Sequence, residues 1–119
     1  MRIGFVVNDV DTEHPSAATT VIAHAAASRG HAVTLFEAAP DIGGQFNLAR
    51  RIPGKEEFDE TLRYYKVRLS ETGVDVRTGH AATVDDLAGF DAIVLATGVE
   101  PRRVAFPGSD DPRLVGYQD

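Results

Sequence analysis

The stretch Arg2–Ser16, "RIGFVVNDVDTEHPS", decides the fold of this chain. It opens with a continuous apolar run, Arg2–Val7, that ends in Asn-Asp, which is typical of a strand buried on both faces of a sheet. An alanine-rich segment with helical periodicity then continues to Arg29, and a second apolar run, "AVTLFE", follows at Ala32–Glu37. Strand, helix and strand in this order predict a right-handed parallel crossover.

The remainder of the chain extends this unit by one helix and two strands. Lys55–Thr72 has an apolar stripe at helical spacing, and Val74–Gly79 and Asp91–Gly98 have the composition of strands. The predicted fold is therefore α/β: a Rossmann-like doubly wound parallel sheet of about four strands in the order 3-2-1-4. In this order the direction of the connections between strands reverses between the first and fourth strands, and a ligand is expected at the carboxyl ends of these two strands.

One domain is expected. Residues 1–103 are predicted to form the Rossmann-like domain, and residues 104–119, which contain two of the six prolines and no periodicity, are predicted to form an irregular C-terminal tail. The apolar face of the first helix is expected to comprise Ala18, Val21, Ile22, Ala25 and Ala26.

The composition of the chain argues against several classes of partner and of chemistry. The chain has 18 acidic against 12 basic residues and a net charge of -6, and such an acidic field repels nucleic acid and anionic membranes. There is no cysteine, which excludes disulfides and thiolate chemistry. No apolar run approaches the roughly 20 residues that a bilayer-spanning helix needs, and the N-terminus lacks a secretory signal pattern, so a cytoplasmic protein is expected.

The segment after the first strand lacks the glycines that such folds use to bind phosphate. Asp9, Asp11 and Glu13 lie there instead, before a helix start at which a diphosphate would be expected. Two like charges about 5 Å apart repel by roughly 3 kcal/mol at an effective dielectric constant of 20, so these acids oppose a phosphate group. Either they cap and solvate the helix, or a divalent cation bridges them to phosphate.

No catalytic or metal-binding constellation is visible in the sequence. The histidines show no metal-ligand spacing, and the serines lack a nucleophile-elbow setting. "PGKEE" at Pro53–Glu57 is predicted to be a helix start, because it lacks the spacing of a phosphate-binding P-loop.

From about Gly30 onward, three motifs carry a resemblance to a known family. They are "RGHAVTLFEAAPDIGGQFNLARRIPGKEEFDETLRYY", "GVDVRTG" and "DAIVLATGVEPR". Residues 30–119 resemble the FAD-binding region of the 2,4-dienoyl-CoA reductase family, in the wider old-yellow-enzyme-like group. The resemblance implies that Glu37 holds the adenosine ribose of FAD. It also implies a flavin-side contact by Gly43, Gly44 and Gln45, and passage of the chain beneath the dinucleotide at Ala96, Thr97 and Gly98.

For Glu37 and for the pair Gly43 and Gly44, the residues themselves also allow a role without a cofactor. A carboxylate at the end of a strand can accept both ribose hydroxyls, but such a position also commonly carries a solvated acid. Gly43 and Gly44 can bring backbone close to a cofactor or can simply make a turn.

The N-terminal stretch "MRIGFVVNDVDTEHPSAATT" resembles something else. Residues 1–28 are similar to the N-terminal domain of RimK-like or glutathione-synthetase-like ATP-grasp ligases, so a chimera that joins two families near "ASRGHAV" is the expected origin of the chain.

The functional prediction from sequence follows from the acidic loop and the mixed resemblance. The chain is expected to be a non-catalytic, chimeric or designed Rossmann-like domain, not an enzyme, with weak or no dinucleotide binding. No cofactor is expected, and FAD if any. The alternative is a truncated FAD-binding module of a 2,4-dienoyl-CoA reductase-like oxidoreductase. A homo-oligomer formed through an exposed edge of the third or fourth strand is also expected.

Overall fold

The structure is a computed structural model that describes residues 1–7, 17–97 and 105–114. Its elements are β1 (Arg2–Val7), α1 (Ala17–Ala27), β2 (Ala32–Glu37), α2 (Phe46–Ala49), α3 (Glu57–Glu71), β3 (Asp75–Thr78) and β4 (Ala92–Leu95). The first two strands have the predicted bounds, whereas the four-residue helix α2 lies in a stretch without a periodic pattern and was not predicted. The acidic segment with Asp9, Asp11 and Glu13 lies outside the described residues.

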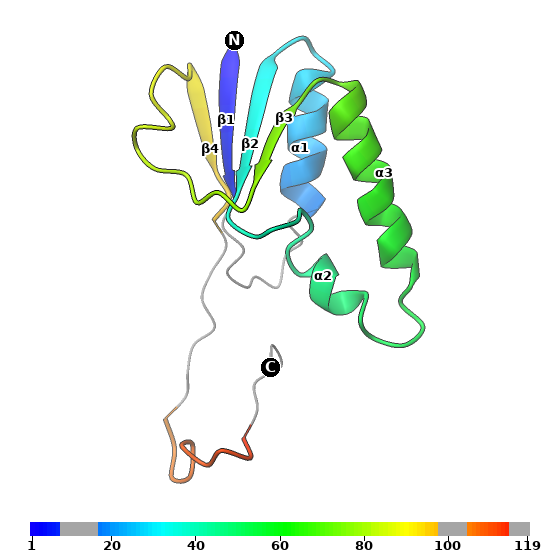
Figure 1. Cartoon of the computed structure of the whole chain (residues 1–119), viewed down its shortest axis with the longest axis vertical. Coiled ribbons are helices and arrows are strands. Elements are labelled where there is room, and N and C mark those ends of the chain that lie inside the picture. Colours follow the sequence, from blue (N-terminus) through cyan, green and yellow to red (C-terminus); the bar gives the residue numbers. More distant parts are fainter. Residues whose placement is uncertain (8–16, 98–104, 115–119) are drawn as a thin grey trace.

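The four strands form one parallel sheet in the order β3-β2-β1-β4, which confirms the predicted fold class (Figure 1). β1 lies inside the sheet and pairs with β2 on one side and with β4 on the other. The register places Val7 opposite Glu37 and Val6 opposite Leu95. The carboxyl ends of β1, β2 and β4 therefore meet at the same edge of the sheet, where the direction of the chain connections reverses.

Helices α1 and α3 both cover one face of the sheet. Alternate residues of β1 and β2 point to this face, as expected from the period of two along a strand. Between the sheet and the helices lies the main hydrophobic core, which consists of Ile3, Phe5, Val7, Ala23, Val33, Leu35, Ile42, Leu69 and Val74. Two residues of the apolar stripe predicted for Lys55–Thr72, Leu62 and Leu69, are buried in α3. The prediction of the stripe is confirmed at these two positions.

The face that α1 buries overlaps the predicted one only in part, since Ala26 packs against the core. Thr20 and Ala23 are buried, whereas Val21 and Ile22 are exposed, Ile22 by 52%. Small side chains allow the helix axis to approach the sheet closely, so packing distance and not side-chain hydrophobicity determines the rotation of this helix.

No described helix covers the second face of the sheet, which is covered instead by the connection from β3 to β4. The Phe36 ring is fully buried, and the Phe90 ring meets it edge-on with a centroid distance of 6.1 Å. The His80 ring lies 5.7 Å from Phe36 and the Arg77 guanidinium 5.2 Å from it. A Cβ atom at Gly4 would lie 3.3 Å from the Phe90 ring, so the glycine lets Phe90 lie directly on β1.

A reciprocal capping turn shapes this connection, as the predicted capping-box spacing implied. The Thr83 N–H donates to Asp86 Oδ2 at 2.8 Å, and the Asp86 N–H donates to Thr83 Oγ1 at 3.3 Å. Residues 84–89 form turns and no regular helix. The Thr83 hydroxyl, the Thr83 backbone N–H and His80 lower the pKa of Asp86 to about 2.

Residues 105–114 contain turns but no helix or strand. The division into a domain of residues 1–103 and a tail of residues 104–119 stays a prediction. Among the helices of the described ranges, none has the length and hydropathy that a bilayer crossing requires.

The corrected face of α1 can be tested by substitution. Ala23→Leu should lower the free energy of unfolding by about 1–3 kcal/mol, because the added methylene groups have no space between helix and sheet. Ile22→Ala, on the exposed face, should change it by less than about 0.5 kcal/mol. Urea denaturation followed by circular dichroism measures both, and the opposite ranking would show that the predicted face is the correct one.

The capping turn makes a prediction about pH. Because the pKa of Asp86 is lower in the folded chain than its usual value of 3.8, the turn is stabilised above that pH and loses this contribution as the pH falls towards 2. A carboxyl-carbon NMR titration should therefore give Asp86 a midpoint well below 3.8. Thr83→Ala should move the midpoint upward, since the Thr83 hydroxyl is the largest cause of the shift; an ordinary midpoint in the unmodified chain would contradict the structure.

Candidate functional site

The candidate site lies at the carboxyl ends of β1, β2 and β4. Neighbouring strands of a sheet are about 4.8 Å apart, so the ends of β2 and β4, which flank β1, are separated by roughly 10 Å. This edge of the sheet brings together Glu37 from β2 and Ala96 and Thr97, which follow β4. Sequence analysis had assigned these residues to one site, although they are far apart in the chain.

Glu37 ends β2 and is held in place by its neighbours. Its side chain is only 1% exposed, and Oε1 accepts the N–H of Ala39 at 2.9 Å. Its backbone carbonyl accepts the N–H of His80 at 3.0 Å. A buried carboxylate needs hydrogen bonds to offset the loss of water, and the Ala39 N–H provides one of them. The expected alternative of a solvated acid at this strand end is therefore wrong for Glu37.

The chain leaves β4 directly beside β1. The Ala96 N–H donates to the carbonyl of Val6 at 2.8 Å, which extends the pairing of the two strands by one residue. Ala96 and Thr97 are half-buried. Gly98, the third residue of this predicted group, lies outside the described residues.

Gly43, Gly44 and Gln45 form a tight turn that leads into α2. Gly43 has φ +124° and Gly44 φ +46°, so both have backbone conformations that favour glycine. A Cβ atom at Gly43 would lie 2.6 Å from Cδ2 of Leu62. Packing against α3 is therefore sufficient reason for a glycine at position 43, independently of any contact that its backbone makes with a cofactor. Gln45 is the N-cap residue of α2, and its side chain makes no capping hydrogen bond.

Asn47, the second residue of α2, is a further residue beside this turn that the sequence pattern did not indicate. Its Nδ2 donates to the carbonyl of Ile42 at 3.1 Å and so fixes the turn. Its Oδ1 is buried and has no hydrogen-bond partner among the described residues. Buried polar atoms are rarely unsatisfied, so this oxygen is a candidate acceptor for a ligand. An amide two residues after a glycine-rich turn was the available signal.

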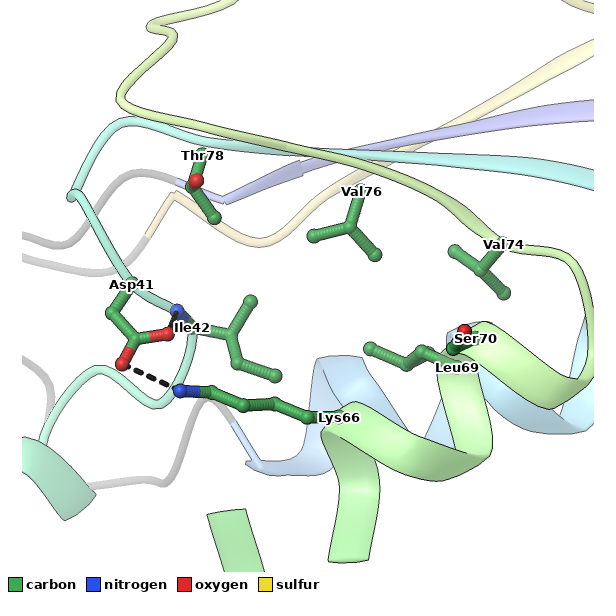
Figure 2. Close-up of a pocket in the computed structure, with 8 residues that line it drawn as sticks. All are labelled: Asp41, Ile42, Lys66, Leu69, Ser70, Val74, Val76 and Thr78. Carbon is green, nitrogen blue, oxygen red and sulfur yellow. Dashed lines mark hydrogen bonds and ion pairs between the residues drawn. The ribbon is translucent and has the colours of Figure 1, made fainter. Parts of the chain in front are cut away.

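A separate pocket of about 440 Å³ opens between α3 and the edge strand β3 (Figure 2). Ile42, Leu69, Val74 and Val76 form its apolar lining, and Lys66 reaches across it to Asp41 at 2.7 Å. Thr78 also lines the pocket and is the register partner of Glu37, so the pocket reaches the strand end beside the candidate site. None of the predicted site residues within residues 17–97 lines it.

Metal-assisted chemistry receives no support from the side chains in residues 1–7, 17–97 and 105–114. These ranges hold no group of three or more histidine, cysteine, aspartate or glutamate residues placed to bind a metal ion.

The four-stranded parallel sheet in the order β3-β2-β1-β4, with helices on one face, defines a Rossmann-like α/β unit. Comparison with known families agrees: residues 17–68 match the family described as NAD(P)-binding Rossmann-like domain. The chain also resembles particular oxidoreductases. It is 44% identical over 96 residues to the N,N-dimethylglycine/sarcosine dehydrogenase of Chromohalobacter salexigens and 35% identical over 95 residues to the NADH oxidase of Thermoanaerobacter brockii.

These alignments cover 76% and 78% of this chain but only 14% and 15% of the two relatives. A solved structure of 2-naphthoyl-CoA reductase in complex with 2-naphthoyl-CoA matches 98% of this chain, with a TM-score of 0.82 and 30% sequence identity. The match covers 17% of the reductase chain. The chain therefore spans about one seventh of the length of the relatives it matches, and these relatives are named as a dehydrogenase, an oxidase and a reductase.

These findings correct three sequence-based expectations. The prediction of a non-catalytic, chimeric or designed domain is wrong, because the relatives are oxidoreductases and the match to one solved reductase covers 98% of this chain. The prediction that the chain is not an enzyme is contradicted for the same reason, because the relatives are named dehydrogenases and reductases. Nothing supports the ATP-grasp origin of residues 1–28, since the family match begins at residue 17 and runs without a break across the expected junction.

The contact between position 43 and Leu62 can be tested by a matched pair of substitutions. Gly43→Ala and Gly54→Ala both place a side chain at positive φ, but a Cβ atom at Gly54 meets nothing within 4 Å. Gly43→Ala should therefore lower the free energy of unfolding by about 1–3 kcal/mol more than Gly54→Ala does. Chemical denaturation gives this difference; equal effects of the two variants would show that the Leu62 contact does not explain Gly43.

Proposed function

We propose that this chain is the adenine-dinucleotide-binding part of a flavin-dependent oxidoreductase and that FAD is the nucleotide it holds. The observation that carries the proposal is the convergence of Glu37 and the Ala96–Thr97 segment on either side of the carboxyl end of β1. In sheets of this topology, ligands bind outside the strand ends at the point where the connections reverse. The similarity to dehydrogenases and reductases supports the same conclusion.

In this proposal Glu37 binds the adenosine ribose. A carboxylate has two oxygens with about four acceptor positions, so Glu37 can keep the Ala39 N–H on Oε1 and also accept a ribose hydroxyl. Because the side chain is 1% exposed, the carboxylate must become accessible when the nucleotide binds. Glu37 thus acts as a positioning group for the adenosine half of the cofactor.

The other two segments contact the remainder of the dinucleotide. The backbone of Ala96 and Thr97 is half-buried beside β1 and offers a surface of small side chains against which a cofactor can lie. Gly43, Gly44 and Gln45, together with Gly98, complete the proposed site. The unsatisfied Oδ1 of Asn47 fits this role, because a buried acceptor without a partner can receive an N–H or O–H group of a bound molecule.

The chemistry of such a protein belongs to the flavin, which, when bound, transfers electrons between two substrates. This chain spans about one seventh of its relatives, so the substrate-binding residues of the complete enzyme are proposed to lie in other parts of that enzyme. What this chain contributes in the proposal is recognition and orientation of the nucleotide.

Titration with FAD and with FMN tests the proposal. FMN lacks the adenosine whose ribose Glu37 is proposed to bind, so FAD should bind more tightly than FMN. A hydrogen bond to a charged group contributes about 1.5–3 kcal/mol, which corresponds to a loss of about ten-fold or more in FAD affinity for Glu37→Gln. The glutamine oxygen can still accept the Ala39 N–H, so this variant keeps the local hydrogen bond of the fold.

Glu71→Gln, which alters an exposed carboxylate at the end of α3, is the matched control and should leave FAD affinity unchanged. Isothermal titration calorimetry measures all of these affinities, and circular dichroism verifies that each variant is folded. Equal affinity for FAD and FMN, or FAD binding that is insensitive to Glu37→Gln, would contradict the proposal.

A further inference from the structure

The turn that leads into α2 is anchored through both polar groups of one backbone residue, Ile42. The Ile42 N–H donates to Asp41 Oδ1 at 2.9 Å, and Lys66 Nζ of α3 donates to Asp41 Oδ2 at 2.7 Å. The Ile42 carbonyl accepts Asn47 Nδ2 of α2 at 3.1 Å. Asp41, Ile42 and Asn47 therefore link α3, the turn and α2 in one continuous series of hydrogen bonds.

This series determines the orientation of the Asn47 amide. If the amide were reversed, Oδ1 would face the Ile42 carbonyl, and two acceptor oxygens would repel each other. Nδ2 must therefore face Ile42, and Oδ1 must point away from it. In this orientation Oδ1 is buried, and no described residue donates a hydrogen bond to it. A buried acceptor in this condition has lost water without gaining another donor, which native proteins rarely tolerate.

The position of Asn47 indicates where the missing donor comes from. The residue as a whole is half-buried, so its side chain lies near the surface of the molecule and not deep in the core. α2 lies beyond the carboxyl ends of the strands (Figure 1). Ligands bind on this side in sheets of this topology. A molecule held at the strand ends can therefore supply the donor that Oδ1 lacks.

We infer that Asn47 Oδ1 accepts a hydrogen bond from the flavin half of FAD. The inference rests on the proposed function, in which Glu37 takes the adenosine ribose, and the adenine amino group lies on that same side of the cofactor. The diphosphate offers acceptors only. The remaining donors are the ribityl hydroxyls and the imide N–H of the flavin ring, all in the flavin half. Asp41 and Lys66 are positioning residues that act through Ile42.

Carbon NMR of the Asn47 side chain in the unmodified chain tests this contact. A hydrogen bond to a carboxamide oxygen withdraws electron density from the carboxamide carbon, so the Asn47 Cγ signal should move downfield when FAD is added. ADP contains the adenosine and the diphosphate but no flavin, and it should leave this signal in place. Both ligands should shift the amide signal of Ala39, whose N–H is bonded to Glu37.

Substitution gives an independent measurement. Asn47→Leu removes the acceptor, and the net contribution of a neutral hydrogen bond corresponds to a rise of about three- to ten-fold in the dissociation constant for FAD. The affinity for ADP should not change. Arg50→Ala is the matched control, because it removes an exposed ion pair with Asp59 at the end of the same helix and should leave both affinities unchanged. Isothermal titration calorimetry measures these affinities, and circular dichroism verifies that the variants are folded.

The outcomes separate this inference from the proposed function. An FAD-induced shift at Ala39 without one at Asn47 Cγ would overturn the inference and leave the proposed function intact. Movement of Asn47 Cγ by ADP as large as that caused by FAD would overturn the assignment to the flavin half, as would equal losses of FAD and ADP affinity in Asn47→Leu. If neither ligand shifts Ala39, the proposed function fails and the inference fails with it.

Discussion

The pairing of β1 with strands on both of its sides is the constraint on which the remainder of the structure depends. Its apolar run provides one side of the main core through Ile3, Phe5 and Val7, and its register sets the positions of β2 and β4. Because both neighbours are parallel to it, their carboxyl ends come to the same edge of the sheet. Glu37 and Ala96 owe their common location to this arrangement and not to their places in the sequence. A single buried strand thus links the hydrophobic effect to the geometry of the candidate site.

The placement of the two large helices on one face gives the molecule two different surfaces. The helix-covered face contains the main core, whereas the opposite face is covered by Phe90 and His80 packing around Phe36. This cover does not bury Ile93 and Leu95 at the β4 edge. Homologous oxidoreductases are several times longer than this chain, so a unit of this kind normally has much more protein around it. Exposed aliphatic side chains on an uncharged edge are understandable in a part of a larger assembly.

The sequence was a good guide wherever a strong periodic pattern coincided with burial. β1 and β2 were predicted with their observed bounds, and the strand order followed from the crossover rule. The buried face of α1 was predicted incorrectly because Val21 and Ile22 are more apolar than Thr20 and Ala23, while close helix-sheet packing requires small side chains. α2 could not be predicted, since four residues after a glycine turn have no period. For the site, sequence placed Glu37 at the strand end but gave no sign that it is buried or that Asn47 fixes the turn.

The functional prediction failed for a different reason. Repulsion between a phosphate and the acids at residues 9–13 is a local effect. The similarity to oxidoreductases extends over about three quarters of the chain and is the stronger guide to function. The central claim is now that the carboxyl end of the sheet binds an adenine dinucleotide, and amide NMR shifts on addition of FAD test it most directly. The account predicts the largest shifts at Ala38, Ala39, Ala96 and Thr97, with little change at Ser70 and Val76 in the separate pocket. Shifts concentrated in that pocket, or none at the strand ends at saturating FAD, would contradict it.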